Sequence, residues 1–183
     1  MVFDQTISLI KDKFADLKDD IILARLGPSD QLLNAVLSKA MIVLQLSTRE
    51  GFEVKVSEAL HKGKPIIITS AGGIPLQVTP DKNGFIIPPR DSDACAKHLF
   101  DLFTDAELHA RMSDYALKNV SDEVHTVGNA LSWMYMANKL TEKGQKEGKR
   151  WVPGGRWVND LAREEAGEGY KDGEPRLPRD LTT

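Results

Sequence analysis

The stretch IVLQLSTREGFEVKVSEALHKGKPIIITSAGGIPLQV, residues 42–78, decides the fold of this chain of 183 residues. The continuous apolar runs at 41–47 and 65–70 predict strands that are buried on both faces. Between them, residues from about 52 to 61 predict a short helix, which Gly63 and Pro65 end. A strand, a helix and a second strand in this order predict two parallel neighbours in one sheet.

The same alternation extends to both sides of this stretch. Two further short apolar runs, at 21–26 and 85–88, bring the predicted number of strands to four. Helical spacing of apolar residues is found at about 2–17, 30–40, 92–103, 105–119 and 124–142. This pattern predicts an α/β fold, a Rossmann-like parallel sheet with helices on both faces.

Composition divides the chain at about residue 140. We predict a Rossmann-like domain over 1–140 and an extended tail over 141–183, which is rich in Gly and Pro and carries nine basic and nine acidic residues. The tail nevertheless contains Trp151, Trp157 and Tyr170, and exposed aromatic residues are unusual in a solvated segment. Two alternatives follow: these side chains dock onto the domain itself, or onto a surface outside this chain.

Bulk composition excludes several classes of partner. The chain has 24 basic and 27 acidic residues and a net charge of -3, which disfavours nucleic acid and membrane surfaces as partners. A single cysteine, Cys95, leaves no disulfide within the chain, as is typical of a reducing compartment. The first residues have no continuous apolar core of a secretory signal. We therefore expect a cytoplasmic protein.

The candidate site lies in the loops that follow the strands at 41–47 and 65–70. Both loops open at the carboxyl edge of a parallel sheet, where ligands bind in such folds. The predicted helix start near Gly51 and Phe52 offers backbone N–H groups to a phosphate. Glu50 and Glu58 are eight residues apart, up to about 12 Å along a helix axis. They suit two separated hydroxyl-bearing parts of one ligand, each charge-assisted bond contributing roughly 1.5–3 kcal/mol.

The string Glu50-Gly51-Phe52-x4-Ser57-Glu58-Ala59-Leu60 resembles the E-x7-E motif of glycosyltransferase family four (group 1). The segments AGGIP, NGF and DAELHARM keep the order of that family's C-terminal domain. LQLSTREGFEVKVSEALHKGKP, GGIPLQV and RWVNDLAREEAG are similar, more narrowly, to its fungal trehalose phosphorylase and trehalose synthase branch. The resemblance implies the C-terminal half of a GT-B fold, which binds the sugar donor in a retaining glycosyltransferase.

The resemblance also implies roles for five residues. Glu50 would contact the donor glucose hydroxyls as the catalytic-site carboxylate. The backbone N–H groups near Gly51, Phe52 and Glu53 would face the sugar and the phosphate. Glu58 would bind the ribose of a nucleotide donor, and it would have no ribose to bind if the donor were glucose 1-phosphate. No cofactor and no metal are expected.

Two departures from the family pattern bear on function. Glu53 stands where many members have Gly, which adds a charge near the sugar site. The family's N-terminal acceptor domain, and the Arg and Lys that neutralise the departing phosphate, are expected to precede the segment present here. Of the nearby basic residues, Arg25, Arg49 and Lys55, none lies at the expected position. We therefore expect a small-molecule donor and, as a partner, a missing acceptor domain or further copies of this chain.

Competing interpretations remain at this stage. The alternative to an enzyme is a truncated module, or a subunit completed by a separate acceptor domain, that holds a sugar phosphate without turnover. A different Rossmann-like nucleotide binder is a third interpretation, although no G-x-G-x-x-G is present. Asp91-Ser92-Asp93 has the letters of a metal-binding D-x-D, but its place before a helix favours an ordinary cap. Cys95 is interpreted as a packed thiol, and the four histidines lack zinc-ligand spacing.

Overall fold

A computed structural model describes residues 2–120, 123–124, 126–146 and 152–169, with side chains up to residue 141 in the third of these ranges. The chain divides into two compact units, Met1–Val36 and Leu37–Thr183. The first unit contains helix α1 (Val2–Lys13), the 3-10 turn η1 (Ala15–Leu17) and the beginning of α2 (Asp30–Lys39). The hydroxyl of Ser29 accepts a hydrogen bond from the N–H of Leu32 and so caps the start of α2.

The run 21–26 is not a strand, so the prediction of four strands is wrong. All six residues are exposed and have no strand pairing, and the side chain of Ile22 is 90% exposed. A strand requires a neighbour to pair its N–H and C=O groups, and that partner is not encoded in the apolar run itself. The charged end of this run has a different contact, since the guanidinium of Arg25 lies 4.3 Å from the centre of the Phe3 ring.

The second unit is built on a parallel sheet of three strands in the order β1-β2-β3. These strands are β1 (Val43–Gln45), β2 (Ile66–Thr69) and β3 (Gly84–Ile87). Their register pairs Val43 with Ile66 and Thr69 with Ile87. The strands predicted at 41–47, 65–70 and 85–88 are confirmed, and the register brings the loops after β1 and β2 to the same edge.

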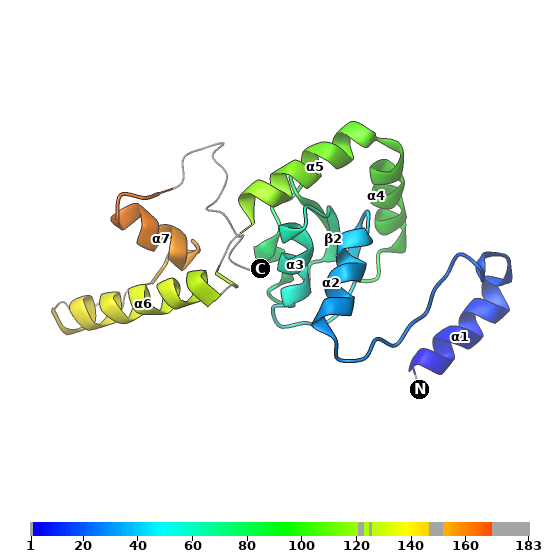
Figure 1. Ribbon diagram of the computed structural model, residues 1–183, viewed down its shortest axis with the longest axis horizontal. Helices are drawn as coiled ribbons and strands as arrows, with labels where there is room; N and C mark the ends of the chain where they lie inside the picture. The colour runs from blue at the N-terminus through cyan, green and yellow to red at the C-terminus, as the bar shows by residue number, and fades with distance from the viewer. Residues whose placement is uncertain (1, 121–122, 125, 147–151, 170–183) are drawn as a thin grey trace. The chain divides into compact units, whose positions relative to one another are not determined.

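Three helices cover this sheet (Figure 1): α3 (Val54–His61), α4 (Ser92–Thr104) and α5 (Ala106–Asn119). The core on one side joins Ile67 and Phe85 of the sheet to Leu102 of α4 and Met112 of α5. Ile66 and Ile68, whose side chains point to the other face because strand residues alternate, are also fully buried, and α3 packs against β2. The predicted α/β sheet with helices on both faces is thereby confirmed.

β1 differs from the prediction in its burial. A continuous apolar run predicts burial on both faces, yet β1 forms one edge of the sheet, and Leu44 and Leu46 are 41% and 42% exposed. β2, which has a neighbour on each side, is buried along its whole length. The run 41–47 therefore has more apolar side chains than the neighbouring described residues bury.

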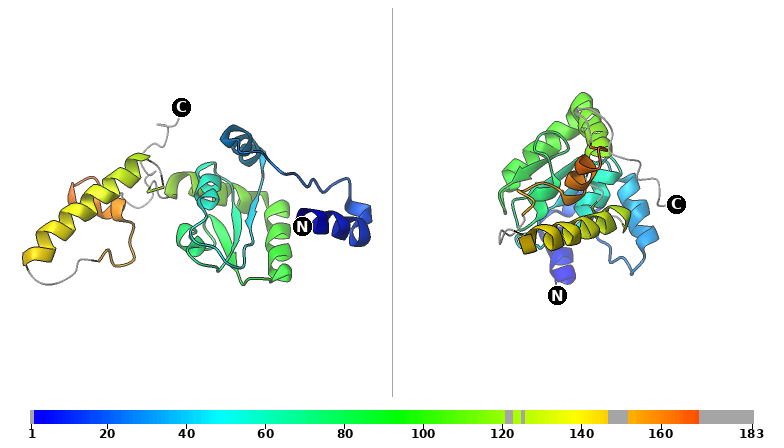
Figure 2. Two further views of the ribbon diagram at one scale, coloured as in Figure 1. Left: turned by 90° about the horizontal axis from the view of Figure 1, so that it is seen from below. Right: turned by 90° about the vertical axis from the view of Figure 1, so that its left-hand side faces the viewer.

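Beyond α5, helix α6 (Thr126–Lys146) pairs with α7 (Val158–Glu165), and Figures 1 and 2 show the two side by side. α7 forms in the segment predicted to be extended, because polar groups join it to its neighbours. The Tyr135 hydroxyl donates to Glu165 at 2.8 Å, and Glu123 accepts from the N–H of Asn159 at 2.6 Å. Burial raises the pKa of the Glu123 carboxyl. The boundary proposed at residue 140 stays a prediction.

None of the helices in the described part of the chain combines the length and the apolar character needed to cross a bilayer.

We predict that Ile67→Ala lowers the free energy of unfolding by about 2–5 kcal/mol, because it leaves a cavity at a fully buried position of the central strand. Urea unfolding followed by circular dichroism measures the change. Ile22→Ala is the matched control and is expected to change stability by no more than about 0.5 kcal/mol. Equal losses in the two variants would contradict the assignment of Ile67 to the core.

Candidate functional site

The loops after β1 and β2 are in direct backbone contact. The N–H of Gly73 donates to the carbonyl of Gly51 at 2.6 Å. Gly72 has a φ of +56°, and a Cβ added to it would lie 1.8 Å from the carbonyl oxygen of Glu50. Only glycine permits both this backbone conformation and this approach. Gly72 and Gly73 therefore lie directly against the Glu50–Phe52 loop of the candidate site.

Helix α3 begins two residues later than predicted, because Glu53 adopts a left-handed conformation with a φ of 57° and becomes the N-cap. Its carboxylate accepts the N–H of Lys55 at 3.2 Å, and its carbonyl accepts the N–H of Val56 at 3.1 Å. The charge expected near the sugar site therefore caps the chain's own helix. Backbone N–H groups at this helix start remain suited to an anion.

Glu50 and Glu58 both lie half-buried, each with a partner from its own segment. The carboxylate of Glu50 accepts the N–H of Gly51 at 3.0 Å. Both carboxylate oxygens of Glu58 lie 2.9 Å from the ammonium of Lys55. The side chains of this ion pair are 45% and 38% exposed, so the pair contributes only about 0–1 kcal/mol, and a polar ligand can replace it. Lys55, which was considered for a phosphate, is engaged by Glu58.

Gln77 is a residue of this region that the sequence analysis missed. Its side chain is only 7% exposed and connects the turn η2 (Ile74–Gln77) to the start of α3. The amide oxygen accepts from the N–H of Ser57 at 3.1 Å and from its hydroxyl at 2.6 Å, while the amide nitrogen donates to the carbonyl of Phe52. No spacing rule finds such a residue, because its partners are 20 to 25 positions away.

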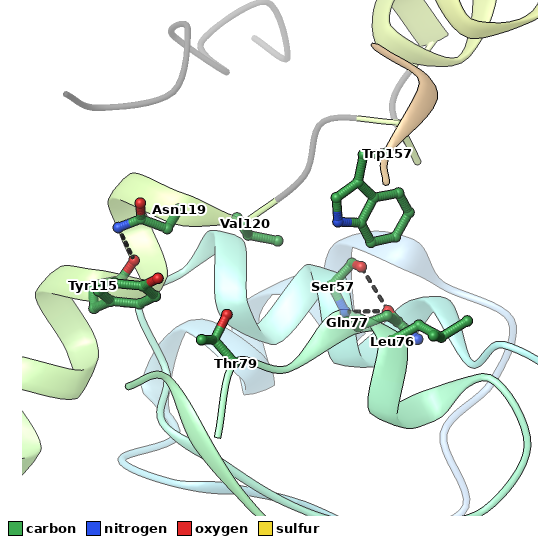
Figure 3. A pocket seen from close by; sticks show the side chains of 8 residues that line it. All are labelled: Ser57, Leu76, Gln77, Thr79, Tyr115, Asn119, Val120 and Trp157. Atoms are coloured by element: carbon green, nitrogen blue, oxygen red, sulfur yellow. Dashed lines mark hydrogen bonds between the residues drawn. The ribbon is translucent and has the colours of Figure 1, made fainter. Parts of the chain in front are cut away.

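Two cavities lie close to these elements. One, of about 320 Å³, lies at the carboxyl ends of all three strands, between residues such as Thr48, Thr69 and Ile87 and the start of α4. The other, of about 130 Å³, is shown in Figure 3 and lies between α3, η2, α5 and Trp157. Neither is lined by Glu50 or Glu58.

Trp157 thus faces residues of its own unit, which supports the first of the two alternatives for the aromatic residues of the tail. Trp151 and Tyr170, for which the same alternatives were raised, lie outside the described residues.

The remaining candidates have structural roles. Asp91 caps α4 by accepting the N–H of Ala94 at 2.9 Å, which confirms the interpretation of Asp91-Ser92-Asp93 as a helix start. Cys95 is buried in the core, and burial raises the pKa of its thiol, so it is a packed side chain as predicted. The ring of His98 stacks on Phe85, and His109 bonds to the carbonyl of Met41. His125 lies outside the described residues.

Comparison with known proteins identifies the family. Residues 11–119 match the model of the glycosyl transferases group 1. The chain belongs to this family. The predicted resemblance is confirmed, and so is the assignment of the fold: the C-terminal domain of a glycosyl transferase group 1 family protein (LpcC) from Francisella tularensis is similar over 64% of this chain and 60% of that one, with a TM-score of 0.57 and 26% identity.

Relatives at the level of sequence are longer proteins. Trehalose phosphorylase of Pleurotus pulmonarius is 52% identical over 180 residues, which are 98% of this chain and 24% of that protein. Trehalose phosphorylase of Grifola frondosa is 52% identical over 179 residues, again 98% of this chain and 24% of that protein. Trehalose synthase of Pyrococcus horikoshii is 30% identical over 64% of this chain and 27% of its own length. The chain spans about a quarter of the length of these relatives.

We predict that Gly72→Ala destabilises the domain more than Gly154→Ala does. Both glycines have a positive φ, +56° and +64°, but a Cβ at Gly154 meets nothing within 4 Å. Gly154→Ala therefore measures backbone strain alone, roughly 1–2 kcal/mol. Gly72→Ala adds the clash with Glu50, about 1–3 kcal/mol more. Urea unfolding of both variants measures the difference; equal losses would show that the two loops do not need their close approach.

Proposed function

We propose that this chain is the donor-binding half of a retaining glucosyltransferase that makes or splits trehalose. The donor is glucose 1-phosphate or a nucleotide-glucose, and the acceptor is glucose or, in the reverse direction, phosphate. The observation that carries this proposal is the fixed contact of the Glu50–Phe52 loop with Gly72–Gly73 at the carboxyl edge of parallel strands. The similarity to trehalose phosphorylases supports the choice of sugar.

Each site residue has a separate task in this proposal. Glu50 accepts hydrogen bonds from the glucose hydroxyls, for which its carboxylate has free acceptor positions beside the one that accepts the N–H of Gly51. The backbone N–H groups of Gly51, Phe52 and Glu53 face the sugar and the phosphate. Glu58 leaves Lys55 to accept the ribose hydroxyls when the donor is a nucleotide sugar. No metal is required, because backbone N–H groups and basic side chains hold the anion.

The departing phosphate needs positive charge, which is usually the largest electrostatic contribution to such a reaction. Of the two basic residues within the motif segment 49–58, Lys55 is paired with Glu58. Arg49 is exposed. We therefore assign the full reaction to this chain together with a further domain that supplies cations and the acceptor pocket.

A second candidate function follows from the small number of basic side chains near the motif. It is a donor-binding module or subunit without turnover of its own. Helix α6 supports this candidate, because its exposed side carries Val127, Trp133, Met134 and Leu140 while the polar Ser132 and Lys139 are buried. Such an exposed apolar side is typical of an interface. The proposed location is the cytoplasm.

We predict that Glu50→Gln abolishes measurable binding of glucose 1-phosphate, because a neutral amide no longer accepts hydroxyl hydrogen bonds as a carboxylate does. Each such charge-assisted bond is worth roughly 1.5–3 kcal/mol, about a ten- to hundred-fold change in Kd. Calorimetric titration of the purified chain measures the affinity, and circular dichroism checks that the fold is kept. Unchanged affinity in Glu50→Gln would refute the assignment of this residue.

Glu58→Gln is the matched control in that experiment. It is expected to weaken binding of UDP-glucose or ADP-glucose and to leave glucose 1-phosphate unaffected, since only a nucleotide donor has a ribose. Loss of both donors in this variant would indicate a general disturbance of α3.

We also predict that the chain alone binds donor without turning it over. Phosphate release from glucose 1-phosphate in the presence of glucose is followed first with the chain alone, and then after addition of the preceding segment of a trehalose phosphorylase as a separate protein. Turnover that appears only in the mixture supports the need for a further domain. Turnover by the chain alone would show that it supplies its own acceptor site and cations.

A further inference from the structure

The buried amide of Gln77 contacts both α3 and the turn that leads into it. Figure 3 shows its hydrogen bonds to Ser57, which lies in the second turn of the helix. On its other side, the amide nitrogen donates to the carbonyl of Phe52 and, at 3.3 Å, to the carbonyl of Glu53. Four hydrogen bonds therefore join one side chain of η2 to the segment 52–57.

The orientation of this amide follows from its partners. The carbonyls of Phe52 and Glu53 can only accept hydrogen bonds, and the N–H of Ser57 can only donate one. The amide NH2 must therefore face the two carbonyls, and the amide oxygen must face Ser57. No other side chain of similar length offers two donors and an acceptor in this arrangement, glutamate included.

Holding these carbonyls also directs the neighbouring N–H groups. In a trans peptide the C=O of one residue and the N–H of the next point in opposite directions. The carbonyl of Gly51 is held by the N–H of Gly73, and the carbonyls of Phe52 and Glu53 by Gln77. Three successive N–H groups, those of Phe52, Glu53 and Val54, therefore point away from the segment 73–77. Successive N–H groups that share one side bind anions.

We infer that Gln77 is a positioning residue for the donor: it fixes the turn 51–54 so that the N–H groups of Phe52 and Glu53, which the proposed function assigns to the donor, face the donor phosphate together with that of Val54. This inference rests on the proposed function for its ligand, whereas the fixing of the turn stands on the hydrogen bonds alone. Gln77 acts through the backbone and does not touch the donor.

The test compares three variants of the full chain. Gln77→Glu keeps the shape and the contact to Ser57 but removes both donors at neutral pH. Gln77→Met removes all four hydrogen bonds at similar length and serves if Gln77→Glu does not fold. Ser57→Ala is the matched control, because it removes the hydroxyl bond of the same network and leaves the two carbonyls held.

Two measurements are made on each variant. Hydrogen exchange followed by NMR reports on the N–H groups of Val56 and Gly73, which are bonded to the carbonyls of Glu53 and Gly51. Titration with glucose 1-phosphate gives the donor Kd, and the thermal midpoint is recorded beside it. In Gln77→Glu we expect exchange at both N–H groups to rise about ten-fold and the Kd to rise about ten- to a hundred-fold, as misplaced binding groups do. In Ser57→Ala we expect the exchange rates and the Kd to stay within about two-fold of those of the unaltered chain, at a comparable thermal midpoint. The reason is that one lost hydroxyl bond is a small change.

The outcomes separate this inference from the proposed function. Unchanged exchange at Val56 and Gly73 in the Gln77 variants overturns the inference, whether or not the chain binds donor. Faster exchange with an unchanged Kd also overturns it, since the turn would then not position the donor. If the unaltered chain does not bind glucose 1-phosphate while exchange still rises in Gln77→Glu, the proposed function fails and Gln77 is established as the residue that fixes the turn.

Discussion

The hydrogen bond from the N–H of Gly73 to the carbonyl of Gly51 is the interaction on which the candidate site depends. It forms because the parallel register of β1 and β2 brings the two following loops to one edge of the sheet. It persists because Gly72 has no Cβ to collide with Glu50. Two loops that are separate in the sequence thus form one continuous surface. Such a surface can hold a sugar in one orientation, which a mobile loop cannot do without an entropic cost.

The electrostatics of this surface are unusual for a phosphate site. Carboxylates outnumber cations in the motif segment: Glu50, Glu53 and Glu58 stand beside the exposed Arg49 and beside Lys55, which is paired with Glu58. The positive potential available to an anion therefore comes mainly from backbone N–H groups at the start of α3. Such groups can orient a phosphate, but they neutralise only part of the charge that develops as it leaves. This distribution of charge is better suited to the proposed binding of a donor than to its cleavage.

The sequence predicts the sheet well where the information is local. The apolar runs at 41–47 and 65–70, with Gly63 and Pro65 between them, are enough to predict β1, α3 and β2. The run at 21–26 has the same composition and forms no strand, because pairing depends on a neighbour that the run does not specify. The predicted burial of β1 is too high because burial, too, depends on neighbours outside the run. Gln77 cannot be found from a local pattern because its partners are distant in the sequence. Contacts between residues 52–57 and 77 arise only after β2 returns the chain to the same edge.

The role of Glu53 in the structure differs from the role expected from the sequence. From the sequence, a glutamate in place of the glycine common in the family adds a charge near the sugar. In the structure its backbone keeps the left-handed conformation that glycine prefers, which costs a glutamate roughly 1–2 kcal/mol. Its carboxylate returns about 1 kcal/mol by capping α3 through the N–H of Lys55. The cap thus offsets only part of the cost, and the contacts that hold the turn from outside it are the hydrogen bonds of the buried Gln77 amide and the Gly73–Gly51 bond.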